Sequence, residues 1–386
     1  MGVVSFGAAR RRWSLLLLVW VVLAVSACEW TDLIDGDEDG DENDATPPAA
    51  ETNIPGLSVA VSTRGFDTTR DALLDAIGSR GNLATRASVD HQANAEDTNL
   101  SLRPTTVVFV SDGNRERALM AADPRVALDL PARVLLYRDS DGDVGVGFSN
   151  AAYLAARYDL NDAENGALDA FDDDLEAIAT EAANADLETS ASAAGIAEGE
   201  GIETVASDDD FNTVVNRLDN AIGSRDALTL IDTINFQSGN TGIGPSTLFI
   251  FGNPNAGTPL MRSNQTVGID LPQKMLVALA DDGTVTVYYN RPAFIAARHD
   301  IDDRDDRIDA IADLLAQIAG ELSHDGLDQV RVDVLHVGDR FTDSPDLVLA
   351  QLVEQLSNHL LFEVHDEDSS PLRTRQLRHV RHLGSE

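Results

Sequence analysis

The chain contains the same domain twice, and this internal repeat limits what it can fold into more than any other feature. Asp129-Leu-Pro131 recurs as Asp270-Leu-Pro272. Between residues 127–160 and 268–301, 13 of 34 positions are identical without a gap. Chance at ordinary composition would give only about two. A unit of roughly a hundred residues is too long for a solenoid repeat. The sequence therefore predicts two complete tandem domains.

Both copies carry the same series of apolar patterns. In the first copy, a strand-like alternation over 57–61 precedes a helical stripe over 66–77, and a hairpin over 133–146 precedes a helix over 165–183. The second copy repeats this order from 202 to about 322. Helices and strands interleave with hairpins, and no long β–α–β series appears. The predicted class is α+β: two tandem small domains, each an antiparallel or mixed sheet with helices packed on one face.

The predicted boundaries follow from changes in composition. They are a signal peptide over 1–28, an acidic disordered tether over 29–55, a first repeat over 56–185, a linker over 186–199, a second repeat over 200–325 and a C-terminal extension over 326–386. The extension is either a truncated third repeat or an unrelated cap, and a cap is favoured. In the tether, Asp35–Gly40 copies half of a calcium loop, but Thr46 stands at the twelfth position, so no metal site is predicted.

The amino terminus has the features of an export signal. Arg10–Arg12 precede an apolar run over 15–25, which ends in Val25-Ser-Ala-Cys28. This ending resembles the bacterial lipoprotein box, which implies that Cys28 is lipidated and anchors the protein to a membrane of the cell envelope, on the periplasmic or extracellular side. The alternative is a soluble secreted protein with one free thiol. Because Cys28 is the only cysteine, intrachain disulfides are excluded.

The charge balance excludes one class of partner. The chain has 66 acidic and 28 basic residues, a formal net charge of −38. Such a field repels polyanions, so nucleic acid is not an expected partner. Acidity combined with a single lysine, Lys274, predicts adaptation to high salt. The alternative is an acidic exported protein from a GC-rich genome.

Motifs in the later half of each copy resemble the domain of unknown function 302 family. They are Phe251-Gly-Asn-Pro254 at a strand end, then Leu260-Met261, and the Asp-Leu-Pro before a hairpin. Together they cover about half of the chain. The resemblance implies a small α+β fold and transfers no activity.

The two copies depart from that pattern in complementary ways. The first copy keeps His91, where the second has Phe236, and the second keeps His299, where the first has Tyr158. The Phe251–Pro254 turn is replaced in the first copy by Val-Ser-Asp-Gly. Neither copy holds the whole set of motifs, so a shared catalytic mechanism is not expected.

Five residues are predicted as candidates for a ligand site: Asn253, Asp270, His299, His91 and Asp129. Asn253 lies in a sharp turn whose amides suit a small polar ligand or an anion, or which simply sets the sheet register. The two aspartates are expected to accept bonds from nearby backbone amides. His91 either titrates near neutrality or is a satisfied structural residue in a strand. The second copy, which keeps the turn, Asp270 and His299, is predicted to hold the site.

No motif for a particular reaction is present. The sequence has no nucleophile elbow, zinc-binding pattern, phosphate loop or dinucleotide fingerprint, and no cofactor is predicted. Met120 and Met261 are expected in the core rather than as metal or haem ligands. The predicted function is that of a lipid-anchored envelope protein whose tandem domains bind a small ligand. The alternatives are an enzyme or redox accessory that uses His91 or His299, and a structural or protein-docking module.

Overall fold

The computed structural model describes residues 54–158, 160, 166–236 and 243–322. Cys28, the signal peptide, almost all of the tether and the whole C-terminal extension lie outside these residues, so the predictions made for them are not addressed by the structure. No helix among the described residues is both long enough and apolar enough to cross a membrane.

The first copy is a six-stranded antiparallel sheet with the strand order β2-β3-β4-β5-β1-β6. Its elements in chain order are β1 (Leu57–Ser62), α2 (Phe66–Gly78), β2 (Ala84–Asp90), α3 (His91–Glu96), β3 (Thr105–Ser111), α4 (Gly113–Ala122), the 3-10 helix η1 (Pro124–Asp129), β4 (Ala132–Arg138), β5 (Val144–Ser149), α5 (Ala151–Tyr158), α6 (Gly166–Ala183) and β6 (Leu187–Ser190).

The second copy is a five-stranded antiparallel sheet with the order β7-β11-β10-β9-β8. Its elements are β7 (Ile202–Ser207), α7 (Phe211–Gly223), β8 (Thr229–Phe236), β9 (Ser246–Gly252), α8 (Pro254–Ser263), the 3-10 helix η3 (Gln265–Ile269), β10 (Gln273–Leu279), β11 (Val285–Asn290), α9 (Pro292–Arg298) and α10 (Asp305–Gly320). Strand for strand, β7, β8, β9, β10 and β11 correspond to β1 to β5 of the first copy.

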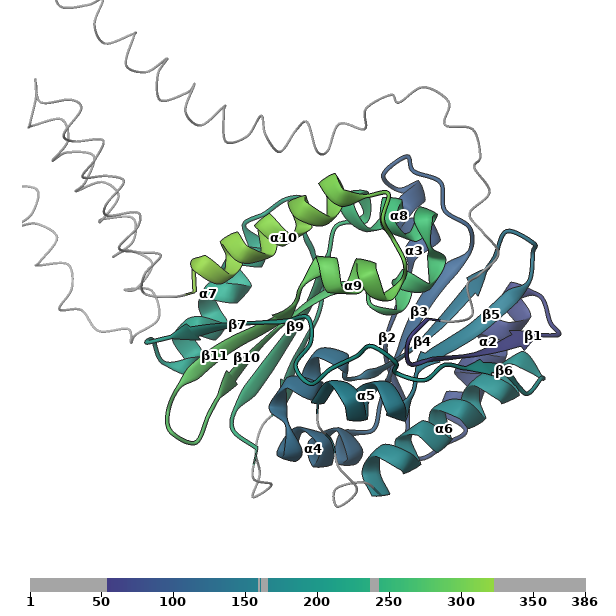
Figure 1. The fold of residues 1–386 in the computed structure, drawn as a ribbon, viewed down its shortest axis with the longest axis horizontal. Coiled ribbons are helices and arrows are strands. Elements are labelled where there is room, and N and C mark those ends of the chain that lie inside the picture. The colour runs from purple at the N-terminus through teal and green to yellow at the C-terminus, as the bar shows by residue number, and fades with distance from the viewer. Residues whose placement is uncertain (1–53, 159, 161–165, 237–242, 323–386) are drawn as a thin grey trace, which may run out of the picture. The chain divides into compact units, whose positions relative to one another are not determined.

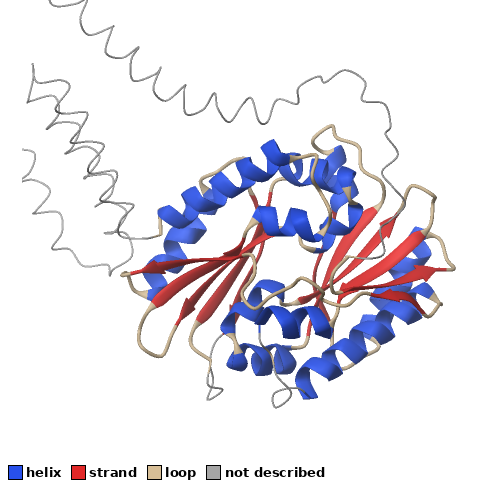
Figure 2. Cartoon of the chain, viewed as in Figure 1, coloured by secondary structure: helices blue, strands red, loops and turns tan. Residues whose placement is uncertain are grey.

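The correspondence extends to irregular features. The second strand of each copy contains a bulge at an equivalent residue, Arg86 in β2 and Ile231 in β8. The Leu-Pro bond after η1 and the Leu-Pro bond after η3 are both cis. These matches confirm the prediction of two tandem α+β domains, and Figure 2 shows the same mixture of helices and strands in both.

In each copy, the copy's own helices cover one face of the sheet. The other copy covers the opposite face. Helices α2 and α6 pack on the first sheet, α7 packs on the second sheet, and α10 packs against α7 (Figure 1). On the opposite faces the copies exchange their 3-10 helices: η3 packs on β3, β4 and β5, while η1 packs on β9, β10 and β11. The central strands are therefore buried on both faces, which explains why they read as continuous apolar runs instead of alternating ones.

One hydrophobic cluster crosses from one copy to the other. It joins the core of the first copy to side chains of the second sheet, including Phe236, Leu248 and Leu276. Met120 and Met261 are buried, at 1% and 2% exposure, as expected for core residues. The two copies therefore form one folded unit.

Two local predictions differ from the structure. Within the predicted linker, Leu187–Ser190 forms β6 and pairs with β1, because its alternating residues complete the edge of the first sheet. His91 was expected in a strand, but β2 ends at Asp90. The Asp90 side chain accepts a hydrogen bond from the Ala93 amide, and this cap starts helix α3 at His91.

Candidate functional site

A cavity of about 300 Å³ lies between the two copies, where α3 packs beside α8. The first copy contributes the end of β2 and the start of α3. The second copy contributes β8, the turn from β9 into α8, the start of β10 and one face of α10. The lining residues are Ser88, Val89, Asp90, His91, Asn94, Leu228, Thr229, Ile231, Phe251, Gly252, Asn253, Pro254, Ala256, Gly257, Thr258, Met261, Leu271, Pro272, Gln273, Ile311, Leu314 and Leu315.

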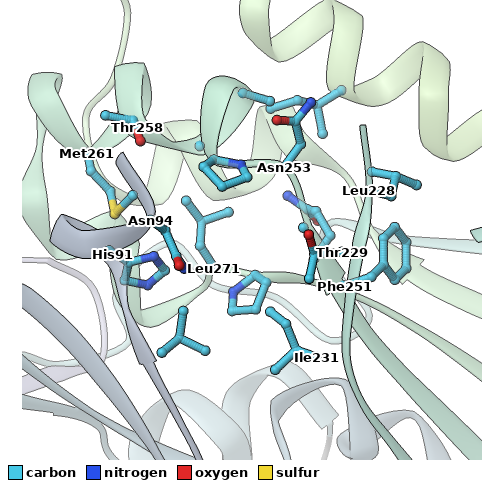
Figure 3. A pocket seen from close by; sticks show the side chains of 18 of the residues that line it. His91, Asn94, Leu228, Thr229, Ile231, Phe251, Asn253, Thr258, Met261 and Leu271 are labelled. Atoms are coloured by element: carbon cyan, nitrogen blue, oxygen red, sulfur yellow. The ribbon is translucent and has the colours of Figure 1, made fainter. Parts of the chain in front are cut away.

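The side chains from the two copies face one another across this cavity. Figure 3 shows His91 and Asn94 on one side of Leu271, with Thr229 and Phe251 on the other. Asn253 caps helix α8, since its Oδ1 accepts a hydrogen bond of 2.9 Å from the Asn255 amide. Its amide oxygen is thus engaged in capping the helix, a local role that neither alternative for this turn had specified.

Three buried polar atoms belonging to lining residues have no hydrogen-bond partner. They are His91 Nε2, Thr258 Oγ1 and Gln273 Oε1. The three side chains are almost fully enclosed, at 6%, 1% and 8% exposure. Leaving a buried polar group unpaired costs about 1–3 kcal/mol. All three atoms are enclosed by neighbouring side chains and have almost no accessible surface, so they are sealed off from the cavity as well.

The cavity carries little charge. Asp90 and His91 are the only ionisable residues in its lining, and the carboxylate of Asp90 caps α3. Burial lowers the pKa of His91 to about 4, although the Gly268 backbone and the charge of Asp90 act in the opposite direction. His91 is therefore neutral at pH 7. It does not titrate near neutrality, which was one of the two expectations for it.

The equivalent position in the first copy is occupied by charged side chains. Three apolar or small lining residues, Ile231, Gly257 and Leu314, correspond to Arg86, Glu116 and Asp174. Arg86 pairs with Asp232 of the second copy at 2.6 Å, and Arg115 pairs with Asp174. The ion pairs stand where the second copy has open, apolar space.

Glu116 and Gly257 differ most in size. Glu116 is 4% exposed, and burial raises the pKa of its carboxyl group. A Cβ atom added to Gly257 would lie 3.3 Å from Leu271 Cδ1 and 4.0 Å from Met261 Cε, two side chains that line the cavity. A glycine at this helical position therefore helps to keep the cavity open.

Asp129 and Asp270 lie outside the cavity lining, in a buried charge network between the copies. Asp129 accepts hydrogen bonds from Arg157 (2.8 Å) and Tyr158 (2.6 Å) and also pairs with Arg133. Asp270 accepts bonds from Arg298 at 2.9 Å and pairs with His299 at 2.8 Å. Side chains hold both carboxylates, where backbone amides were expected.

The two arginines of this network reach across to the opposite copy in matching ways. Arg157 donates to the Asn290 side chain at 2.6 Å and to the Glu200 carbonyl at 3.1 Å. Arg298 donates to Ser149 at 3.0 Å and to the Pro55 carbonyl at 3.1 Å. Each guanidinium also stacks on an aromatic ring of the other copy, Arg157 at 4.5 Å from Phe294 and Arg298 at 3.9 Å from Tyr153.

Burial and neighbouring charge set the ionisation of this network. Burial acts to raise the pKa of Asp270, but Arg298, His299 and Arg133 hold it well below its ordinary value. Burial lowers the pKa of Lys274 well below its ordinary value, and the amine donates to the carbonyls of Asp270 and Pro272. Burial also lowers the pKa of His299, despite the adjacent carboxylate. Both ring nitrogens of His299 have partners, Asp270 and Thr266.

The structure thus divides the five predicted site residues into two groups. His91 and Asn253, which come from different copies, line one cavity. Asp129, Asp270 and His299 lie together in the buried network. Thr258, Gln273 and Gly257 were not identified from the sequence. Comparison of the copies could have pointed to Gly257, because a helical glycine stands there opposite a glutamate in the other copy.

No group of three or more His, Cys, Asp or Glu side chains that could hold a metal ion occurs among the residues the structure describes.

Comparisons with known proteins identify a family. The sequence profile described as "Domain of unknown function DUF302" matches residues 57–180 and 203–321, more than half of the chain. The fluoride-specific ion channel FluC 1 of Brucella suis biovar 1 is 35% identical over 88 residues, which are 23% of this chain and 30% of the channel. FluC 2 of Brucella melitensis biotype 1 shows the same identity over 28% of its length. The chain spans less than a third of these curated relatives.

A solved structure of an uncharacterized conserved DUF302 protein from Bacillus stearothermophilus is also similar. It is 14% identical, with a TM-score of 0.30, and the match covers 33% of this chain and 98% of that one.

Proposed function

Because the chain belongs to the domain of unknown function DUF302 family, whose description names no activity, we propose its function from geometry: the two copies together bind one small molecule in the cavity between them. The observation that carries this proposal is the mostly apolar cavity of about 300 Å³ that both copies line, with a few polar residues such as Asn94 and Thr229 among the lining. Enclosed apolar pockets with a few polar groups are the usual form of small-molecule sites.

The difference between the copies supports binding over a purely structural role. Paired charged side chains fill the equivalent position of the first copy, so this fold does not require a cavity there. Instead, Ile231, Gly257 and Leu314 leave space in the second copy. Binding is also favoured over catalysis, because both nitrogens of His299 are engaged in the buried network.

We also propose that this binding unit is held on the exported side of a membrane through lipid on Cys28. The support is the signal-like amino terminus and its Val-Ser-Ala-Cys ending. In this arrangement the acidic segment after Cys28 acts as the tether.

The test uses a variant that fills the cavity with the first copy's own side chain. A set of uncharged one- and two-ring fragments is screened by thermal shift against the wild type and Gly257→Glu. We expect some fragments to stabilise the wild type, by about 2.7 kcal/mol at a hundredfold excess over Kd. The same fragments should leave Gly257→Glu unchanged, because the glutamate side chain enters the space they occupy.

The matched control is Gly166→Glu, which adds the same side chain at the exposed start of α6, where no atom lies within 4 Å of the added Cβ. It should respond to fragments like the wild type. If Gly257→Glu loses its folded structure, Gly257→Val serves as the uncharged filling variant. Fragment shifts that are equal in the wild type and in a folded filling variant would exclude this cavity as the site.

A further inference from the structure

The two sheets differ at one edge. In the first copy, β6 pairs antiparallel with β1 and forms the edge of the sheet beyond it. In the second copy, β7 corresponds to β1, and among the residues that the structure describes its only neighbouring strand is β11. In an antiparallel sheet, alternate residues of an edge strand direct their amide and carbonyl groups away from the sheet. The edge of β7 can therefore pair with a further strand.

The burial of the two strands reflects this difference. Residues Leu57–Ala60 of β1 are all buried, because β5 and β6 flank the strand. At the corresponding positions β7 is only partly buried, and its residues Thr204 and Ala206 are exposed. The edge of β7 is thus accessible to an added segment.

In each copy, the chain leaves its last helix beside this edge. In the first copy, Ser62 at the end of β1 donates a hydrogen bond of 3.2 Å to the Ala183 carbonyl at the end of α6, and β6 follows shortly after. In the second copy, Ser207 at the end of β7 donates a hydrogen bond of 2.8 Å to the Leu322 carbonyl, just after α10. Residues 323–386 continue from this point. The continuation therefore starts beside β7, as the segment that forms β6 starts beside β1.

One segment of the continuation has the residue pattern of a strand. Val330-Arg-Val-Asp-Val334 alternates β-branched with charged residues, a pattern that suits an added strand. Val330 lies eight residues beyond Leu322, and eight residues can span about 26 Å. β6 contacts Ser58–Ala60 of β1, which correspond to Glu203–Val205 of β7. These residues lie within roughly 14 Å of Ser207 along the strand, so the segment can reach them.

We propose that Val330–Val334 adds to the edge of β7 as an antiparallel strand, in the position that β6 has on β1. Main-chain hydrogen bonds to Glu203–Val205 then close the edge. A second copy of the chain is disfavoured as the occupant, because each chain has a net charge of −38 and two such chains repel each other. A segment joined to α10 by a short connection has instead an effective concentration in the millimolar range. β7 contributes no residue to the cavity, so this proposal goes beyond the proposed function and is independent of it.

The test is hydrogen exchange of the full chain, measured by mass spectrometry on peptides that cover β7. In the wild type, the outward amides of β7 should exchange slowly, because the added strand accepts their hydrogen bonds. Val332→Pro removes an amide from the middle of the added strand and prevents regular pairing. We expect the outward amides of β7 to exchange at least about tenfold faster in this variant. Exchange of β1, whose edge β6 covers, should not change.

The matched control is Ser370→Pro, which places a proline in the same extension but outside the proposed strand. Its β7 amides should exchange as slowly as those of the wild type. A synthetic peptide of residues 326–338, added at about millimolar concentration to Val332→Pro, should restore slow exchange of β7. The same peptide with the proline substitution should have no effect.

Equal exchange of β7 in the wild type and in Val332→Pro would overturn the proposal, whether that exchange is fast or slow. Slow exchange in both proteins that becomes fast on dilution would overturn it in favour of a second copy of the chain. Faster exchange in Val332→Pro that extends equally to β1 would show a general loss of stability and would also overturn it.

Discussion

At the scale of single residues, the consequence of a side chain depends on which copy carries it. Phe236 stands in the second copy where His91 stands in the first, and both are buried. The phenyl ring of Phe236 joins the hydrophobic cluster, whereas His91 lines the cavity and keeps one ring nitrogen buried without a partner. Because burial lowers the pKa of His91 to about 4, its imidazole carries no charge at pH 7.

The lowered pKa of His91 predicts a pH dependence of stability. In the unfolded chain His91 takes up a proton below about pH 6.5, but in the folded protein only below about pH 4. The unfolded state therefore binds more protons between these values, and the free energy of unfolding falls as the pH drops through this window. For His91 alone the loss amounts to about 3 kcal/mol.

The measurement is chemical unfolding of the wild type and His91→Phe at several pH values from 4 to 8. The difference in the free energy of unfolding between the two proteins should stay constant from pH 7 to 8. As the pH falls to 4, the wild type should lose more stability than His91→Phe. Parallel pH profiles would contradict a neutral, buried His91.

At the scale of elements, the exchange of 3-10 helices holds the copies together. Helix η1 ends at Asp129 and packs on β10 of the other copy, where Lys274 is buried at 1% exposure. Arg157 and Arg298, at equivalent positions of the two copies, each donate a hydrogen bond to a side chain of the other copy. Breaking a buried ion pair leaves a charge without its partner and destabilises a protein by about 3–5 kcal/mol.

The single lysine allows this interface to be monitored chemically. In the native protein an amine-reactive ester should label Lys274 very slowly, because the amine is enclosed. Arg298→Met should speed labelling, since the loss of a partner of Asp270 destabilises the interface by about 3 kcal/mol. The labelled fraction at Lys274 is read by mass spectrometry after digestion.

Arg70→Met is the matched control, because Arg70 forms only exposed ion pairs within α2. Its labelling rate should equal that of the wild type. Rapid labelling of Lys274 in the native wild type would mean that β10 is not covered as described.

At the scale of the whole molecule, the described residues form a fused pair whose copies have diverged. In the first copy, ion pairs of Arg86 and Arg115 fill the position that corresponds to the cavity. In the second copy, that position is an apolar cavity. A single chain can evolve such asymmetry because its two copies mutate independently, whereas two identical chains cannot. The proposed binding site therefore belongs to the fused pair and to neither copy alone.

The proposed membrane anchor gives a prediction for the intact cell. If lipid on Cys28 holds the protein at a membrane, Cys28→Ser should move it from the membrane fraction to the soluble fraction and prevent lipoprotein-specific cleavage. Fractionation with immunodetection, together with the mass of the mature amino terminus, measures both effects. Ser26→Thr keeps the cysteine and should remain membrane-bound. Retention of Cys28→Ser on membranes would exclude this anchor.

The sequence by itself determined the duplication, the α+β class and most of the helices and strands. These properties are encoded locally: the helical stripe of α2 and the apolar run of β4 are visible within a few residues, and the repeat doubles the signal. The turn at Asn253 was also visible, as a Gly-Asn-Pro after a strand. One local feature was missed: β2 ends at Asp90, and helix α3 begins at His91. The sequence did not predict this end, because it depends on how the chain leaves the sheet.

Only the tertiary structure decided how the copies meet, and hence which residues line the cavity between them. His91 and Asn253 are far apart in the chain and belong to different copies, so no periodicity or spacing links them. Asp270 and His299 looked like site residues because they are polar and distinctive, yet the packing of η1 and η3 onto opposite sheets encloses them in an ion network. Local patterns specify local structure, whereas a cavity between two copies depends on side chains from both.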